Sequence, residues 1–122
     1  AKDYTEMQWR IMQQKKPKDY VIATGHAYSV KQFVNIAANY LGMKILWSGK
    51  GLNEIGYTLN KNKKEILIKI DKKYFRPNEV EYLKGDASKA LKDLKFKPKY
   101  SFKALVEDMI DGDLLEAKKE LK

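Results

Sequence analysis

Residues 29–42 read SVKQFVNIAANYLG, and this stretch carries the clearest secondary-structure signal in the chain. Its apolar residues recur every three or four positions, which is the spacing of one face of a helix. Ser29 and Gln32 have the spacing of a capping box, in which each side chain hydrogen-bonds to the other residue's backbone N–H. Gly42 suits the left-handed position that commonly follows the end of a helix. The stretch therefore predicts a helix that ends just before Gly42.

The residues on either side of this helix predict an alternation of helices and strands. Residues 4–14 have helical spacing after a potential cap at Asp3, and residues 20–23, YVIA, form a short apolar run suited to a buried strand. Residues 44–47 predict another strand. The order helix, strand, helix, strand is typical of α/β folds.

The second half of the chain predicts shorter elements separated by turns. Ile66, Ile68 and Ile70 alternate, so one face of that strand is apolar. Gly112 is expected to weaken the last helix, so that its tail frays. The expected elements are a Gly-rich loop at 48–57, a polar turn at 60–64, a strand at 65–70, an irregular connection at 71–78, a short strand at 80–83, a short helix capped by Asp86, and a last helix capped by Ser101.

Composition excludes several classes of protein. The chain has 122 residues and 43% hydrophobic content, enough for one small domain spanning residues 1–122. No apolar run approaches the roughly 20 residues that a membrane-spanning helix needs. There is no Cys and a single His, His26, so disulfides and Cys- or His-based metal sites are not expected. A cytoplasmic location is the default expectation.

The formal net charge of +9 comes almost entirely from lysine. The lysines are spread along the whole chain, whereas proteins that bind phosphate backbones usually concentrate their charge and use arginine freely. Most of the lysines are therefore interpreted as a solvated surface. Arginine occurs only at Arg10 and Arg76, which makes each of these positions more informative.

The strongest candidate site is the run RPNE at residues 76–79. Pro77 restricts Arg76 to extended backbone, and a guanidinium projected from a stiff loop suits a bidentate contact with phosphate. Glu79 could accept hydrogen bonds from sugar hydroxyls. An ordinary surface loop with a weak ion pair is compatible with the same residues.

Three other patterns are interpreted as coincidental. Gly49-Lys50-Gly51 lacks the helix that follows a phosphate-binding loop. Tyr-x-x-x-Lys spacing occurs twice, but one pair straddles the helix stop at Gly42 and the other lies in a turn. His26 has no carboxylate or serine nucleophile in a motif with it.

Seven further groups of residues form recognisable motifs: AKDY at 1–4, YVIATG at 20–25, YSV at 28–30, WSGKG at 47–51, YFRP with EV between 74 and 80, GD with SKA between 85 and 90, and KP with SF between 97 and 102. Together they resemble the GDP-mannose 4,6-dehydratase family of the extended short-chain dehydrogenase/reductase superfamily. The resemblance extends over nearly the whole chain. Two departures occur, with Asn78 in place of the usual Thr and Lys95-Phe96 where Gly-Trp or Asn-Trp is common.

The resemblance implies a C-terminal substrate-binding subdomain, with helices packed on a few short strands and no complete Rossmann domain. It implies that Arg76 contacts the diphosphate of a GDP-sugar and that Glu79 contacts the ribose. Lys50, in the Gly-rich loop, is a further candidate for substrate binding. The implied reaction converts GDP-mannose to GDP-4-keto-6-deoxy-mannose with NADP.

The resemblance also places the catalytic Thr and Glu, the Tyr-x-x-x-Lys pair and the NADP-binding loop in an N-terminal Rossmann half that precedes this segment. We therefore expect no catalytic residue in this chain and no dehydratase activity from the chain alone. We expect the full-length enzyme to be a lyase that can assemble as a homo-oligomer. Two alternatives stay open at this point. One is a related nucleotide-sugar dehydratase or epimerase, and the other is a basic nucleic-acid-binding module.

Overall fold

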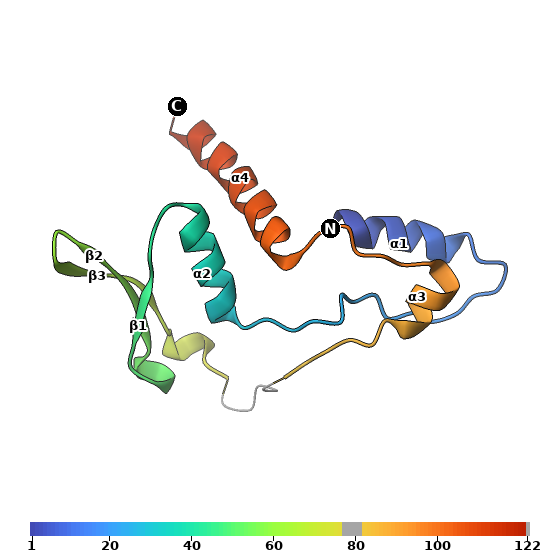
Figure 1. Ribbon diagram of the computed structural model, residues 1–122, viewed down its shortest axis with the longest axis horizontal. Helices are drawn as coiled ribbons and strands as arrows, with labels where there is room; N and C mark the ends of the chain where they lie inside the picture. The colour runs from blue at the N-terminus through green and yellow to red at the C-terminus, as the bar shows by residue number, and fades with distance from the viewer. Residues whose placement is uncertain (77–81, 122) are drawn as a thin grey trace. The chain divides into compact units, whose positions relative to one another are not determined.

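The computed structural model describes residues 1–76 and 82–121 (Figure 1), and clustering of contacts along the chain divides it into two compact units. Unit 1 combines Ala1–Tyr28 with Glu81–Lys122, and unit 2 is Ser29–Val80. Helices and a small antiparallel sheet confirm the predicted α/β class. The prediction of one domain over the whole chain stays a prediction.

Unit 2 begins with helix α2, Val30–Tyr40, where the predicted capping box is confirmed. The Gln32 backbone N–H donates to Ser29 Oγ at 3.1 Å, and the Ser29 backbone N–H donates to Gln32 Oε1 at 2.7 Å. Gly42 has a φ of +74°, the left-handed conformation predicted for the end of this helix. Local sequence therefore determines both ends of α2.

The remainder of unit 2 is a three-stranded antiparallel sheet in the order β1 (Leu46–Ser48), β2 (Ile55–Asn60), β3 (Lys63–Lys69). The polar turn predicted at residues 60–64 is confirmed at its centre, because Lys61 and Asn62 both have positive φ, as a tight hairpin turn requires. The residues on either side of this pair belong to β2 and β3 instead. The prediction of a loop over residues 48–57 was wrong at both ends, because Ser48 ends β1 and the last three residues belong to β2.

Unit 1 packs helix α1 (Lys2–Met12) against helix α3 (Ser88–Leu94). The buried cluster contains Met7 together with Ala90, Leu94 and Phe96. The Arg10 guanidinium adds a polar link by donating to the Leu94 carbonyl oxygen at 2.9 Å. This contact supplies a partner to a carbonyl at the end of α3, where helical partners are lacking.

The predicted caps of unit 1 have mixed outcomes. Ser101 is confirmed, since its Oγ accepts from the Ala104 backbone N–H at 3.2 Å at the start of α4 (Phe102–Glu120). Asp3 does not cap α1, which begins after Ala1, and its carboxylate instead accepts from the Lys99 backbone N–H at 3.0 Å. Asp86 lies one residue before the helix cap at Ala87. Helix α4 continues past Gly112 to Glu120.

The predicted strand at residues 20–23 is not a strand in the described part of the chain. A strand requires a neighbour that pairs with its backbone, and no described segment provides that ladder here. Residues 82–83 are likewise not in a strand, and residues 80–81 lie outside the described residues. Gly85 approaches the apolar run closely, since a Cβ built on it would lie 2.6 Å from Ala23 Cβ.

Replacing Ser29 with Ala should lower the free energy of unfolding by about 1 kcal/mol, because the capping bond at the start of α2 is lost. Urea denaturation monitored by circular dichroism measures this change. Ser29→Asp is the matched control, since it retains an acceptor oxygen and should lose far less. Equal losses in the two variants would contradict a capping role for Ser29.

Candidate functional site

The candidate site lies at one end of the sheet in unit 2, and strand register puts it there. Ile55 pairs with both Ser48 and Lys69, so the end of β1, the start of β2 and the end of β3 lie together. The loop that contains Lys50 joins β1 to β2 at this end. The segment that leads to Arg76 leaves β3 at the same end, opposite the hairpin turn (Figure 1). The segments that carry two of the predicted site residues, Lys50 and Arg76, thus start at the same end of the sheet.

The Lys50 loop is closed by backbone contacts. Gly49 has a φ of +87°, and a Cβ built on it would lie 2.2 Å from the Asn53 carbonyl oxygen, so only glycine fits there. The Asn53 backbone N–H donates to the Lys50 carbonyl oxygen at 3.2 Å at the start of a short 3-10 helix, Gly51–Asn53. Lys50 itself is exposed and extended. Its ammonium group is therefore carried on a constrained backbone.

Lys64 connects two strands beside this loop. Its Nζ donates to Ser48 Oγ at 3.3 Å and lies 4.1 Å from the centroid of the Tyr57 ring. A cation over an aromatic face is a favourable contact. Lys64 therefore ties β3 to β1 across β2 at the point where β1 enters the Lys50 loop.

Arg76 follows a second short 3-10 helix, Lys72–Tyr74, which Asp71 caps by accepting from the Lys73 backbone N–H at 2.9 Å. Arg76 is exposed. The prediction for Glu79 falls outside the described residues, as does that for Pro77. The roles of Arg76, Glu79 and Lys50 in substrate binding therefore stay predictions. The structure describes Lys50 and Arg76, and both are exposed.

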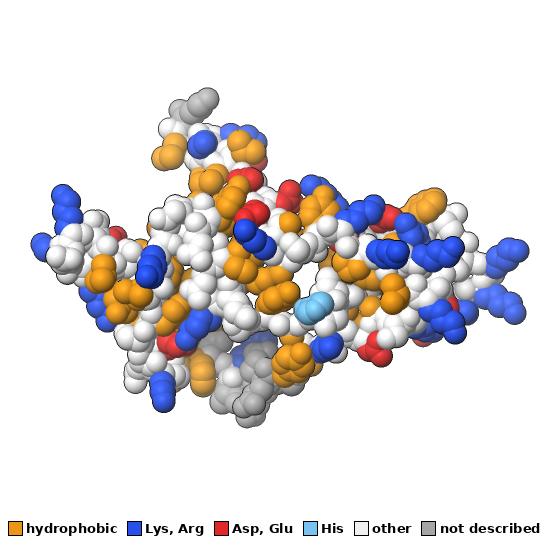
Figure 2. All heavy atoms as spheres, viewed as in Figure 1, with side chains coloured by type: hydrophobic (Ala, Val, Ile, Leu, Met, Phe, Trp, Pro, Cys, Tyr) orange, Lys and Arg blue, Asp and Glu red, His pale blue; other side chains and the backbone are white. Residues whose placement is uncertain are grey.

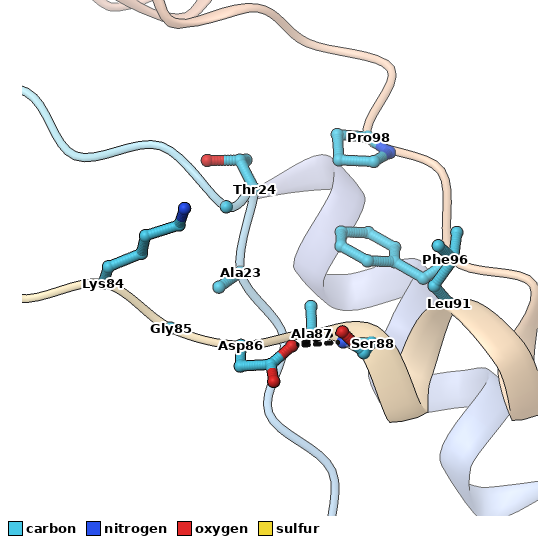
Figure 3. A pocket seen from close by; sticks show the side chains of 11 residues that line it. Ala23, Thr24, Lys84, Gly85, Asp86, Ala87, Ser88, Leu91, Phe96 and Pro98 are labelled. Carbon is cyan, nitrogen blue, oxygen red and sulfur yellow. Dashed lines mark hydrogen bonds between the residues drawn. The ribbon is translucent and has the colours of Figure 1, made fainter.

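Unit 1 contains a separate open cavity of about 550 Å³ (Figure 3). Its walls come from the apolar run near Ala23, from residues around Asp86, and from Phe96 and Pro98. Asp86 Oδ1 accepts from the Ser88 backbone N–H at 2.9 Å and from the Ser88 hydroxyl at 2.5 Å. These hydrogen bonds, the one from the hydroxyl first, hold the pKa of the Asp86 carboxyl below its usual value.

His26 does not form a catalytic arrangement. It is exposed, and its Nδ1 lies 3.1 Å from the Thr24 carbonyl oxygen. Nearby, the rings of Tyr28 and Phe102 stack with their centroids 4.0 Å apart, a contact that sequence spacing could not predict. Within the described ranges, no cluster of acidic, His or Cys side chains could hold a metal ion.

Lys and Arg side chains occur at many places on the face drawn in Figure 2. The interpretation of the lysines as a solvated surface and the nucleic-acid alternative both stay predictions. None of the helices in the described part of the chain combines the length and apolar character required to cross a membrane.

Comparisons with known proteins agree on one family. A family model described as GDP-mannose 4,6 dehydratase matches residues 1–109. GDP-mannose 4,6 dehydratase of Drosophila melanogaster is 44% identical over 93% of this chain, and the enzyme of that name from Homo sapiens is 41% identical over the same share. GDP-mannose 4,6-dehydratase of Yersinia enterocolitica is 41% identical over 97% of this chain.

These relatives all carry the name GDP-mannose 4,6-dehydratase. The chain is a member of the GDP-mannose 4,6-dehydratase family. It spans only 28% of the length of the Drosophila relative and 34% of the Yersinia relative, and it corresponds to their C-terminal part. The family resemblance predicted from the sequence is confirmed.

Gly49→Ala should destabilise the protein by about 2–3 kcal/mol, because it combines a left-handed φ with a backbone clash. Gly51→Ala is the matched control. Gly51 also has a positive φ, +56°, but a Cβ there meets nothing within 4 Å. The control should lose only about 1 kcal/mol, and chemical denaturation of both variants measures the difference. Equal losses would show that the close approach to Asn53 does not constrain the loop.

The Asp86 hydrogen bonds predict a pH dependence of stability. Because the folded-state pKa is lowered, their contribution is fully present above the unfolded carboxyl pKa of about 4 and is lost as pH falls through the lower folded value. Asp86→Asn keeps an oxygen acceptor but cannot titrate. The midpoint temperature of thermal unfolding should therefore fall less steeply between pH 6 and pH 2 in this variant than in the parent. Parallel pH profiles would contradict the assignment.

Proposed function

We propose that the chain is the GDP-sugar-binding part of a GDP-mannose 4,6-dehydratase, a lyase that converts GDP-mannose to GDP-4-keto-6-deoxy-mannose. The observation that supports the proposal is the antiparallel register of unit 2, in which the strand before the Lys50 loop and the strand before the Arg76 segment end at the same end of the sheet. Two cations carried by segments that start there suit a diphosphate, the most strongly charged part of a GDP-sugar. Membership of the family supports GDP-mannose as that ligand.

In this arrangement Arg76 contacts the diphosphate through its planar guanidinium, which can donate two parallel hydrogen bonds. Lys50 supplies a second positive charge from the constrained loop. Glu79 contacts the ribose, an assignment that rests on the resemblance because this residue lies outside the described part. The arrangement binds and orients an anion.

NADP, which the family resemblance implies as cofactor, does not fit the Gly-rich loop of this chain. After Gly49-Lys50-Gly51 the chain forms a single turn of 3-10 helix and then β2, whereas a dinucleotide-binding loop opens directly into a helix. We therefore assign NADP binding and the catalytic Thr, Glu, Tyr and Lys to the N-terminal Rossmann half of the full-length enzyme. No reaction step is assigned to residues of this chain.

The same proposal includes a cytoplasmic location and a full-length enzyme that can assemble as a homo-oligomer. It also places the fragment in the extended short-chain dehydrogenase/reductase superfamily, as the substrate-binding subdomain. A related nucleotide-sugar dehydratase or epimerase would use the same diphosphate contact, so activity with GDP-mannose distinguishes these enzymes.

In the full-length enzyme, Arg76→Ala should raise the KM for GDP-mannose by one to two decades. This follows from roughly 1.5–3 kcal/mol for a hydrogen bond to a charged group. Steady-state kinetics with GDP-mannose as the varied substrate measures the effect. Arg76→Lys should fall between the parent and the Ala variant, because it keeps the charge and loses the planar fork.

Arg10→Ala is the matched control for this experiment, since Arg10 is the only other arginine in the chain. It contacts the Leu94 carbonyl oxygen and Glu6 within unit 1, so its loss should lower stability and leave the KM for GDP-mannose unchanged. An unchanged KM in Arg76→Ala would remove Arg76 from the binding site. Equal KM increases in both variants would point to a general loss of structure.

A further inference from the structure

One face of α2 holds both ends of the loop that carries Lys50. Lys31 and Asn35 are four residues apart on this helix, so their side chains lie on the same face. Asn35 contacts Trp47, in the strand before the loop. Lys31 contacts the same Trp47 and also Glu54, the residue directly after the loop. None of these pairings follows from the family motifs, because they join residues 12 to 23 positions apart.

The exit of the loop is held by an ion pair. Lys31 Nζ lies 2.5 Å from Glu54 Oε1, and Glu54 is the residue directly after the 3-10 helix of the loop. The Glu54 side chain is 27% exposed and that of Lys31 is 42% exposed, so solvent screens this pair less than a fully exposed one. The Glu54 backbone N–H also donates to the Gly51 carbonyl oxygen at 3.1 Å. Glu54 therefore links the helix face directly to the backbone of the loop.

The entrance of the loop is held by Trp47, two residues before Gly49. Its indole Nε1–H donates to Asn35 Oδ1 at 2.9 Å, and Lys31 Nζ lies 4.9 Å from the centroid of its rings. One ammonium group thus contacts the entering strand through a cation–π interaction and the leaving residue through an ion pair. Between these two anchors the closed backbone at Gly49 leaves Lys50 little freedom to move.

We propose that Lys31 is a positioning residue for nucleoside-diphosphate binding, acting through Glu54 and Trp47 to hold the loop that presents Lys50. The inference rests on the proposed function, in which Lys50 contacts the diphosphate. Lys31 does not itself contact the ligand in this account, because the Glu54 carboxylate already neutralises its charge. Its contribution is preorganisation, which lowers the entropic cost of ordering the loop when the ligand binds.

The test is a double-mutant cycle in the full-length enzyme, with GDP-mannose as the varied substrate. Lys50→Ala should raise the KM about tenfold, the loss of one modest charged contact. Lys31→Met should raise it about fivefold with an unchanged kcat, because only the placement of Lys50 is altered. The double variant should be no worse than Lys50→Ala, since a positioning residue has no effect once the residue that it positions is gone.

Three further variants are controls for misfolding and for nonspecific effects of removing a charge. Lys31→Arg should restore the parental KM, because a guanidinium can keep both the ion pair and the contact with Trp47. Glu54→Gln removes the other partner of the ion pair and should raise the KM by about the same factor as Lys31→Met. It tests the positioning role if Lys31→Met does not fold. Lys119→Met removes an exposed ion pair with Glu116 on α4 and should leave the KM unchanged.

The outcomes separate the two claims. If Lys50→Ala raises the KM while the effects of Lys31→Met and Lys50→Ala multiply, the positioning role is overturned and the binding role of Lys50 stands. If Lys31→Met and Glu54→Gln both leave the KM unchanged, the positioning role is likewise overturned. If Lys50→Ala has no effect, both claims about this loop fail, while the role of Arg76 is decided by its own variant.

Discussion

The pairing of β2 with β3 is the constraint on which the candidate site depends. Ile55 lies opposite Lys69, so the chain enters and leaves this hairpin at one end. A shift of register by one residue would turn every side chain of a strand to the other face and would change which loop residues meet. The tight turn at Lys61 and Asn62 fixes the register at the opposite end. The Lys50 loop and the segment that leads to Arg76 therefore both start at the open end of this hairpin.

Unit 1 is held by a different kind of contact, in which a small apolar cluster is surrounded by polar links to backbone. Met7 and Leu94 are almost completely buried, while Arg10 and Asp3 each bond to backbone groups more than 80 residues away. A cluster of this size contributes limited hydrophobic stabilisation, so the hydrogen bonds to otherwise unpaired carbonyl and N–H groups matter for the alignment of α1 with the segment after α3. The predicted ligand contacts, Lys50 and Arg76, belong to unit 2 and not to unit 1.

Local features of the fold could be predicted from the sequence, whereas features that depend on distant partners could not. The capping box at Ser29 and the cap at Ser101 were correct because each bond joins residues three positions apart. β2 was missed over its whole length because its glycine and the preceding loop conceal the strand pattern. Residues 20–23 have strand composition but no described neighbour to pair with. Arg76 could be singled out by its rarity, but only the strand register shows that its segment and the Lys50 loop start at the same end of the sheet.

The central claim is that unit 2 binds the diphosphate of a GDP-sugar between the two loops at one end of its sheet. A crystal structure of the full-length enzyme with GDP bound tests it most directly. The account predicts diphosphate oxygens within about 3 Å of both the Arg76 guanidinium and the Lys50 ammonium. A diphosphate bound elsewhere, with both of these side chains in solvent, would contradict it.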